Sequence, residues 1–226
     1  ITSPRQRTIR QRIGARRDAY PSNTHTIDDH FQLLSTIGVQ ANDRSLEFFV
    51  AKVNQCFAHD LLSGKLLLDG RLKIGIFPGA AWDYKCWPAD RFADIADQMK
   101  EKYNAAILLF GGAADAELVS QVRDSMQTDP ILFRTDLQLG QLAALISCCD
   151  QFVSNDTGPA HIAVALGIPT IVLFGVTNHL KFGPFDPMHT VIRYGDSLDR
   201  SKGSEMMRLI TVSEVWKVVE EKLNEL

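Results

Sequence analysis

The sequence predicts an α/β protein in which a doubly wound parallel sheet, covered by helices on both faces, occupies residues 66–226. Short apolar runs alternate with longer segments of helical periodicity, which is the pattern of parallel strands joined by right-handed crossovers. Within each run the apolar residues are continuous, as expected when both faces of a sheet are covered. The composition agrees, because the 226 residues are 45% hydrophobic and 23% charged, which excludes a disordered or collagen-like chain.

Residues 1–65 do not complete a second domain of this kind, and we interpret them as the tail of an N-terminal domain followed by a linker. The apolar residues of 28–38 follow helical spacing, and Gly38 suits the end of that helix. The other elements predicted here are a short strand at 46–50 and a helix at 54–68.

From residue 72 onward, predicted strands and helices alternate regularly. The helix after the first strand shows the periodicity clearly: Phe92, Ile95 and Met99 fall on one side, and Pro88 stands at its start. Most of the strands end in small or polar residues, which predicts loops along one edge of the sheet. The predicted strands are 72–77, 105–110, 129–133, 150–155, 169–175 and 189–194, and the predicted helices are 87–103, 114–126, 137–149, 157–167 and 211–226.

The charge is unevenly distributed along the chain. The net charge of −3 argues against general nucleic-acid binding. Six of the 24 basic residues nevertheless lie in residues 1–17, which hold no acid, so that the remainder carries 18 basic and 27 acidic side chains. This asymmetry indicates an anionic partner near the start, although a merely solvated basic segment has the same composition. The six are Arg5, Arg7, Arg10, Arg12, Arg16 and Arg17.

The four cysteines, Cys56, Cys86, Cys148 and Cys149, show no metal-binding spacing. The last two lie in an apolar stretch, where we expect them to be buried as small hydrophobic side chains. Free thiols are typical of a reducing compartment, so we expect a cytoplasmic protein. We also expect it to hold neither a metal nor a cofactor. No apolar run approaches the roughly 20 residues that a membrane-spanning helix needs.

The segment SNDTGPAH at 154–161 carries the strongest functional signal. Ligands of an open α/β sheet bind beyond the carboxyl ends of its strands, where this segment lies. Asp156 and Thr157 favour the N-cap of a helix, whose free N–H groups and dipole suit a phosphate, and Gly158 allows close approach. A well-capped structural helix with a buried histidine would explain the same residues. The predicted phosphate site comprises Asp156, Thr157, Gly158, Pro159 and His161.

Lys85 lies in the loop that follows the first predicted strand. A lysine there reaches a diphosphate as a mobile point charge, whereas most loop lysines are only solvated. We expect Pro78, Gly79, Trp82 and Trp87 to hold the loop in place. Because the loop is predicted to be exposed, replacing Lys85 should weaken nucleotide binding with little effect on folding.

Gly111 and Gly112 form a turn after the second predicted strand, and Asp115 and Glu117 follow it. An acidic residue in this position accepts hydrogen bonds from ribose hydroxyls, or simply adds negative charge to the first turn of a helix. Both roles are compatible with the sequence, and either of the two acids could fill them. It contains no G-x-G-x-x-G, Walker or G-x-S-x-G motif.

Several of these segments together resemble glycosyltransferase family 9, the heptosyltransferases of lipopolysaccharide core synthesis. The resemblance covers roughly residues 74–225, and the DDHFQLLSTIG segment at 28–38 is similar to the helix that ends the first domain in this family. The NDTGPAH…ALGIP…LFG block is the most specific part. The segments are FPGAAWDYKCWPADRFADIA, LLFGGAADAEL, LAALISCCDQFVSNDTGPAHIAVALGIPTIVLFG and GPFDP.

The resemblance implies a GT-B enzyme with two Rossmann-like domains, the N-terminal one for the acceptor and the C-terminal one for the nucleotide-sugar. It implies an inverting, metal-independent transfer of a heptose from ADP-L-glycero-β-D-manno-heptose to Kdo-lipid A or to a heptosylated core. By the same resemblance Lys85 would bind the diphosphate, Asp156, Thr157 and Gly158 would form the phosphate-binding helix start, Asp115 or Glu117 would hold the ribose, and His161 would line the site.

The implied acceptor is an anionic, lipid-linked sugar, which places the basic segment on the acceptor side. We expect Arg5, Arg7, Arg10 and Arg12 to line the acceptor site or to contact the surface of the inner membrane. The family's catalytic base is an aspartate early in the N-terminal domain, and no residue here corresponds to it. Since the first residue is isoleucine rather than methionine, we expect the natural N-terminus to be missing and this chain alone to be inactive.

Two departures from the family pattern leave the donor open. Ala80 and Ala81 stand where some relatives carry phosphate-binding hydroxyls, although Pro78, Gly79 and Ala80 are still predicted to line the donor site. The segment 192–210 lacks the cysteines that many members have. Alternatives are therefore a GT-B transferase or epimerase with a UDP- or GDP-sugar, its base read by the backbone around Thr135–Leu139, and a non-catalytic nucleotide-binding module.

Overall fold

The computed structural model describes residues 24–64, 70–133, 136–195 and 197–225. They belong to two compact units. The larger unit contains Leu46–Thr177 and Gly183–Leu226, and the smaller one contains the chain up to Ser45 together with Asn178–Phe182. Within the described ranges, no helix is both long and apolar enough to span a lipid bilayer.

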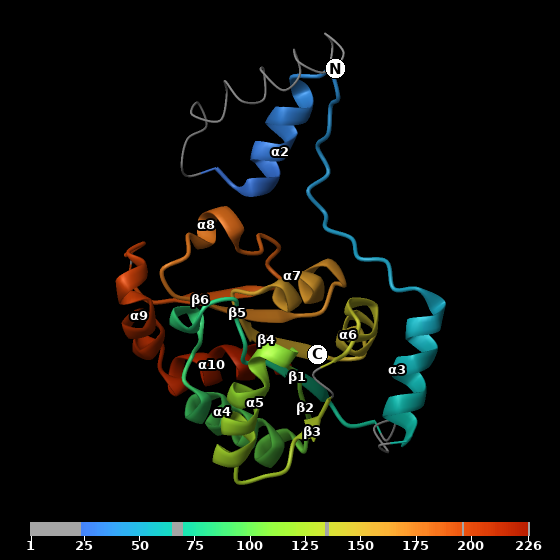
Figure 1. The fold of residues 1–226 in the computed structure, drawn as a ribbon, viewed down its shortest axis with the longest axis vertical. Helices are drawn as coiled ribbons and strands as arrows, with labels where there is room; N and C mark the ends of the chain where they lie inside the picture. Colours follow the sequence, from blue (N-terminus) through green and yellow to red (C-terminus); the bar gives the residue numbers. More distant parts are fainter. Residues whose placement is uncertain (1–23, 65–69, 134–135, 196, 226) are drawn as a thin grey trace. The chain divides into compact units, whose positions relative to one another are not determined.

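The larger unit is built on a six-stranded, entirely parallel sheet with the strand order β3-β2-β1-β4-β5-β6 (Figure 1). This is the order of doubly wound dinucleotide-binding folds, and its switch point lies between β1 and β4. The predicted fold class is therefore confirmed. The strands are β1 Lys73–Phe77, β2 Ala106–Leu109, β3 Ile131–Leu132, β4 Gln151–Asn155, β5 Thr170–Phe174 and β6 Thr190–Arg193.

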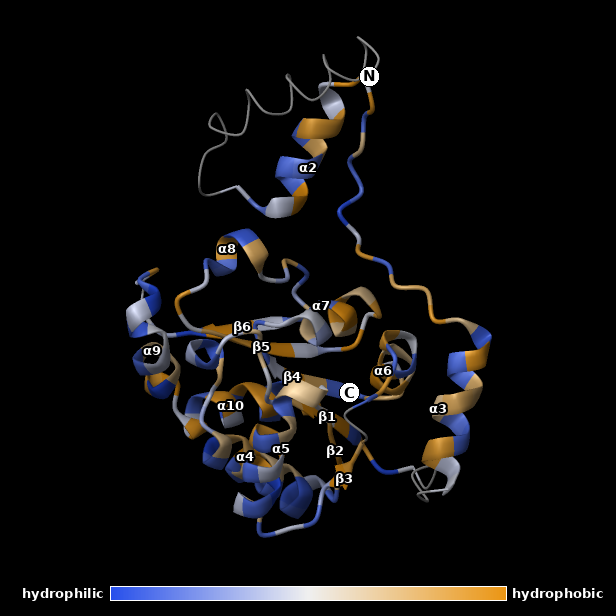
Figure 2. Ribbon diagram, in the orientation of Figure 1, coloured by the Kyte–Doolittle hydropathy of each residue, from blue (hydrophilic) through white to orange (hydrophobic). Residues whose placement is uncertain are grey.

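Helices cover both faces of this sheet (Figure 1). On one face, Ile74 and Ile76 of β1 share a core with residues of α4, α5 and α10; on the other, Phe152 of β4 packs with residues of α3, α6 and α7. The strands are predominantly hydrophobic in Figure 2, whereas the helices also carry hydrophilic residues on their outer sides. The helices of the larger unit are α3 Lys52–Gly64, α4 Ala89–Tyr103, α5 Ala116–Ser125, α6 Leu139–Ile146, α7 Gly158–Ala165, α9 Gly203–Leu209 and α10 Val212–Leu223, with short 3-10 turns η2 Asp83–Lys85, η3 Ala113–Asp115 and η4 Arg200–Lys202.

The predicted elements from residue 72 onward are all present, with shorter ends. Phe92, Ile95 and Met99 are completely buried; of the two adjacent cysteines expected to be buried, Cys149 is buried and Cys148 only partly so. The predicted helix at 54–68 corresponds to α3, which ends at Gly64 before residues that lie outside the described ranges.

The strand predicted at 46–50 is wrong, because these residues pair with no strand of the sheet. Of its apolar residues only Val50 is buried, where it joins the core beside α3, while Phe49 is 89% exposed. An apolar run needs a neighbouring strand as well as β-forming residues, and no such neighbour is available here. η4 and α9 correspond to no element predicted from the sequence.

The smaller unit consists, in the described residues, of α2 Thr26–Ser35 and α8 His179–Phe182 with their flanking segments. The two helices are joined by a hydrogen bond from Thr26 Oγ1 to the Lys181 carbonyl (2.9 Å) and by an ion pair between Lys181 and Asp29 (3.7 Å). Gly38 adopts a positive φ of 84°, and the next N–H, that of Val39, donates back to the Leu34 carbonyl (3.2 Å), so Gly38 ends the turn that closes α2, as predicted.

Candidate functional site

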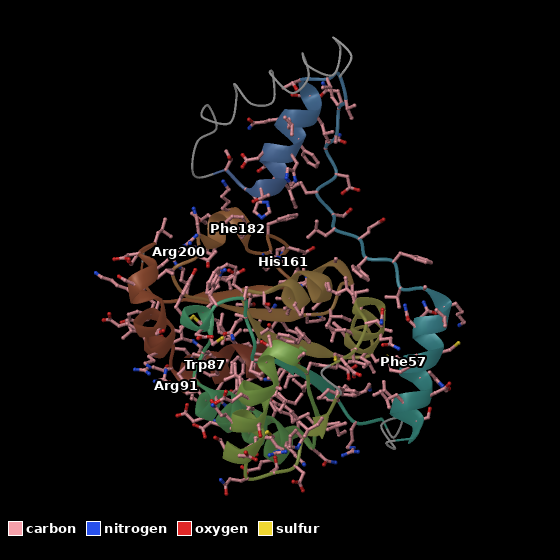
Figure 3. The ribbon with its side chains drawn as sticks, viewed as in Figure 1. Phe57, Trp87, Arg91, His161, Phe182 and Arg200 are labelled. Atoms are coloured by element: carbon pink, nitrogen blue, oxygen red, sulfur yellow. The ribbon has the colours of Figure 1, made fainter. Side chains whose placement is uncertain are left out.

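The loops after β1, β2 and β4 lie at the carboxyl edge of the sheet, on neighbouring strands. Every residue predicted to bind the donor lies in one of these loops, in η3 or in the first turns of α5 and α7. Because β1 and β4 flank the switch point, their loops come closest to one another there, as the side-chain contacts below show. Figure 3 shows the side chains of this region, with His161 labelled on α7.

Lys85 and Asp156 form an ion pair across the switch point. Lys85 Nζ lies 2.7 Å from Asp156 Oδ2, and the side chains are only 20% and 8% exposed. His161 Nε2 lies 3.9 Å from the other carboxylate oxygen of Asp156, and the imidazole is 48% exposed. The structure thus brings together three predicted site residues. It also shows that His161 is not a buried core histidine.

This ion pair corrects the expectation that Lys85 is irrelevant to folding. Lys85 lies in the turn η2 and is four-fifths buried, not solvated. Asp156 is almost completely buried, and an unpaired carboxylate at such a depth is strongly destabilising. Lys85 therefore contributes to stability as well as presenting a charge at the edge of the sheet.

The N-cap of α7 falls on one of the two residues that the sequence favours for it. Its N-cap is Thr157, whose side chain makes no capping hydrogen bond, and Asp156 precedes the cap and pairs with Lys85 instead. The N-cap predicted at Asp156 or Thr157 is therefore confirmed at Thr157, but neither side chain makes a capping hydrogen bond to the helix. The Thr157 carbonyl accepts from the N–H groups of Ala160 (3.1 Å) and His161 (3.4 Å).

Two backbone N–H groups remain for a ligand at this helix start. Pro159 has no N–H, and among the described residues the N–H groups of Thr157 and Gly158 donate to no protein acceptor. A Cβ built on Gly158 would meet no atom within 4 Å, so the space next to this glycine is open. The helix start thus presents two N–H groups and open space near the Lys85 ammonium, an arrangement whose charge suits an anion.

Asn155, which the sequence analysis did not single out, fixes the β1 loop from the end of β4. Its Nδ2 donates to the Pro78 carbonyl (2.5 Å), and its Oδ1 accepts from the Trp87 N–H (3.1 Å). The side chain is completely buried, so both bonds are shielded from water. An amide at the last position of a predicted strand, directly before the Asp-Thr-Gly segment, was the available signal.

The predicted roles of the two loop tryptophans differ in the structure. Trp87 anchors the loop as expected: it is fully buried, its Nε1 donates to the Ile210 carbonyl (2.9 Å), and its ring meets Phe92 edge-on at 5.0 Å. Figure 3 shows it beside Arg91, which donates to the same carbonyl. Trp82 is 59% exposed, so the expectation that it holds the loop is wrong.

The turn η2 is held by Tyr84 instead. A Cβ built on Gly203 would come within 2.6 Å of Tyr84 Cδ2 and 2.7 Å of its carbonyl oxygen, so only glycine allows α9 to approach this turn. The Tyr84 ring stacks in turn with Trp82 at 6.3 Å between centroids and an interplanar angle of 14°.

The structure separates Asp115 from Glu117. The Asp115 carboxylate accepts a hydrogen bond from the Gly112 N–H (2.9 Å) and lies against Gly79, where a Cβ would be 2.1 Å from Asp115 Oδ1. Glu117 is exposed on α5, and among the described residues its carboxylate accepts a hydrogen bond from Gln121 alone (3.4 Å). Asp115 therefore contacts the β1 loop, whereas Glu117 points to solvent.

The Cys86 thiol is not available as a nucleophile at neutral pH. Burial, together with the negative charges of Asp83 and Asp115, raises its pKa to about 11. A thiol with so high a pKa stays protonated.

Some predicted features lie beyond what the structure describes. Arg5, Arg7, Arg10 and Arg12 fall in residues 1–23, and Thr135 falls in the gap before α6, all outside the described ranges. Across the described part of the chain, no group of three or more His, Cys, Asp or Glu side chains is arranged to hold a metal ion.

Comparison with known proteins gives consistent matches. The model of glycosyltransferase family 9 (heptosyltransferase) matches residues 7–209. Lipooligosaccharide heptosyltransferase 2 of Haemophilus influenzae is 32% identical over 171 residues, which cover 71% of this chain and 49% of that protein. Lipopolysaccharide heptosyltransferase 3 of Escherichia coli is 32% identical over 114 residues, 50% of this chain and 33% of the relative.

Solved structures agree with the sequence matches. A family 9 glycosyl transferase from Veillonella parvula superposes with a TM-score of 0.83 at 30% identity, covering 91% of this chain and 61% of that one. ADP-heptose lipopolysaccharide heptosyltransferase II of E. coli gives a TM-score of 0.67 at 25% identity, covering 79% and 54%. The chain spans about a third to a half of the length of the curated relatives it matches. Since the family model covers most of its residues, the chain belongs to glycosyltransferase family 9.

Proposed function

We propose that this chain supplies the donor-binding part of an inverting, metal-independent heptosyltransferase. The enzyme would move a heptose from ADP-heptose to the inner core of lipopolysaccharide, either Kdo-lipid A or a core that already bears heptose. The observation that carries this proposal is the Lys85–Asp156 ion pair beside the unpaired N–H groups of Thr157 and Gly158. The relatives named as heptosyltransferases, and the neighbour named for ADP-heptose, support the choice of donor.

The ion pair suits a leaving diphosphate. Asp156 Oδ2 engages one of the three N–H bonds of the Lys85 ammonium, which leaves two for phosphate oxygens. As the glycosidic bond breaks, negative charge grows on the diphosphate, and Lys85 and the two backbone N–H groups are already oriented to stabilise it. Asp156 acts by holding the ammonium in place, since a carboxylate would itself repel phosphate. In this arrangement the charge is stabilised by the protein's own groups.

The nucleoside would extend from the diphosphate toward β2. Asp115 lies against the β1 loop at Gly79, and its carboxylate keeps lone pairs beyond the one used by Gly112, so it can accept from ribose hydroxyls. Of the two acids left open by the sequence, we therefore assign the ribose to Asp115. Pro78, Gly79, Ala80, Gly111 and Gly112 would form the close-approach backbone on either side of it.

The N-terminal part of the chain is proposed to belong to the acceptor side of the enzyme. We assign donor binding to residues 66–226, and we assign residues 1–65 to the tail of the acceptor-side domain and the linker. The acceptor would be an anionic lipid-linked sugar, with Arg5, Arg7, Arg10 and Arg12 on its side and a peripheral contact with the inner membrane. No residue of this chain is assigned as the catalytic base.

Calorimetric titration of the chain with ADP, UDP and GDP tests this proposal. We expect ADP to bind most tightly, and Lys85→Met to weaken it by about 1.5–3 kcal/mol, the range for hydrogen bonds to charged groups. Lys217→Met is the matched control, because Lys217 is 77% exposed on α10, where it pairs with the neighbouring Glu221. Equal ADP affinity in Lys85→Met would contradict the site. Tighter binding of UDP or GDP would contradict the donor.

A further inference from the structure

Trp82 is exposed in a loop whose other large side chains are packed. Its side chain is 59% exposed, whereas Trp87, five residues later, is completely buried. The third tryptophan, Trp216 of α10, packs against Tyr103 at the end of α4. Exposing an indole gives up a large burial energy. Nothing in the packing of the loop requires Trp82 in this place.

The indole is nevertheless held in a defined position. It stacks with Tyr84, which is wedged against Gly203 at the start of α9. The Trp82 carbonyl accepts the N–H of Lys85 (2.9 Å), so the residue belongs to the same turn as the proposed diphosphate cation. Trp82 is thus a fixed aromatic surface, stacked on Tyr84 and open to solvent elsewhere.

The contacts at the two ends of the loop indicate on which side of the proposed nucleotide the Trp82 indole lies. At its start, Gly79 contacts Asp115, which follows β2. At its end, Tyr84 contacts Gly203 of α9, the helix whose Met207 packs under Gly175 at the end of β5. β2 and β5 lie on opposite sides of the switch point. With the ribose at Asp115 on the β2 side, the Tyr84 ring that carries the Trp82 indole contacts α9 on the β5 side, which is the side left for the sugar.

We propose that the Trp82 indole is the stacking surface for the transferred sugar and a determinant of donor specificity. A pyranose has an apolar face of C–H groups, and the negative face of an aromatic ring attracts the positive edges of such groups. This assignment rests on the proposed function, because the direction of the nucleotide follows from it. It predicts that Trp82 distinguishes ADP-heptose from ADP.

The test uses the tryptophan fluorescence and the affinity of the whole chain. Only Trp82 is well exposed, so acrylamide quenches it preferentially. ADP-heptose should protect this component from quenching, and ADP should not. Trp82→Ala should weaken ADP-heptose binding about two- to tenfold, the equivalent of one aromatic stacking contact, and leave ADP affinity within about twofold. Trp82→Phe, which keeps a ring, should lie between. Leu209→Ala, an exposed residue of α9, is the control and should change neither affinity.

The outcomes separate this inference from the proposed function. Equal protection by ADP and ADP-heptose would overturn it in favour of stacking on the base. Binding of both nucleotides without protection of Trp82, or with unchanged affinities in Trp82→Ala, would overturn it and leave the diphosphate site standing. Failure of the unaltered chain to bind either nucleotide would overturn the proposed function and this inference together. Melting temperatures of the variants confirm that each is folded.

Discussion

Removing one or both charges of the Lys85–Asp156 ion pair gives the most direct test of the site. The two side chains meet at 2.7 Å and are 20% and 8% exposed, so neither charge is well solvated. Breaking a buried pair by removing one partner costs about 3–5 kcal/mol, because the other charge stays buried without compensation. Since Lys85 keeps a fifth of its exposure, we expect Lys85→Met to lower the free energy of unfolding by about 3 kcal/mol.

Removing both charges should cost much less than removing one. In Lys85→Met combined with Asp156→Asn, no buried charge remains, and replacing a whole pair by neutral groups is often nearly neutral. We therefore expect the double variant to lose about 1 kcal/mol, and the coupling energy of the double-mutant cycle to reach about 2 kcal/mol or more. Urea denaturation of the four proteins at pH 7 measures each free energy of unfolding.

The same four proteins separate stability from ligand binding. ADP binding should be lost in the double variant, although its stability recovers, because the ammonium that would meet the diphosphate is absent. A coupling energy below about 0.5 kcal/mol, the size found for exposed pairs, would refute the buried-pair reasoning. Undiminished ADP affinity in the double variant would instead refute the role of Lys85 in the site.

Three further predictions follow from single side chains. Gly158→Ala should abolish ADP binding in calorimetry while the melting temperature changes by less than about 4 °C, because a Cβ there meets no protein atom and fills only the open space; a large loss of stability with normal binding would show a purely structural helix start. Gly79→Ala should destabilise by about 1–3 kcal/mol in urea, because its Cβ would be 2.1 Å from Asp115 Oδ1, and adding Asp115→Ala should recover part of the loss; a cost independent of Asp115 would contradict the contact. Burial lowers the pKa of His189, so the unfolded state takes up the proton at a higher pH than the folded state, and stability falls as the pH drops below about 6.5. His189→Gln should therefore reduce the difference between the urea unfolding midpoints at pH 7.5 and pH 5.5, and an unchanged difference would contradict this.

The sequence by itself determined the sheet and the edge at which the site lies. Continuous apolar runs such as 72–77 and 105–110 are local signals, and the alternation with helices leaves few possible topologies. Because parallel strands end at one edge, the sequence already predicts that the loops carrying Lys85, Asp115 and Asp156 lie together. The strand predicted at 46–50 is wrong because its residues favour a strand, but strand pairing also needs a neighbouring strand, and the sequence of the segment carries no information about one.

Only the tertiary structure decided what each side chain in those loops does. Lys85 and Asp156 are 71 positions apart, and their pairing depends on the register of β1 against β4. Trp82 and Trp87 occupy one loop, yet one is exposed and the other buried, because the Ile210 carbonyl and the Phe92 ring contact Trp87 and not Trp82. Such contacts join segments distant along the chain, and burial, charge pairing and close approach at a glycine arise only when those segments are packed together.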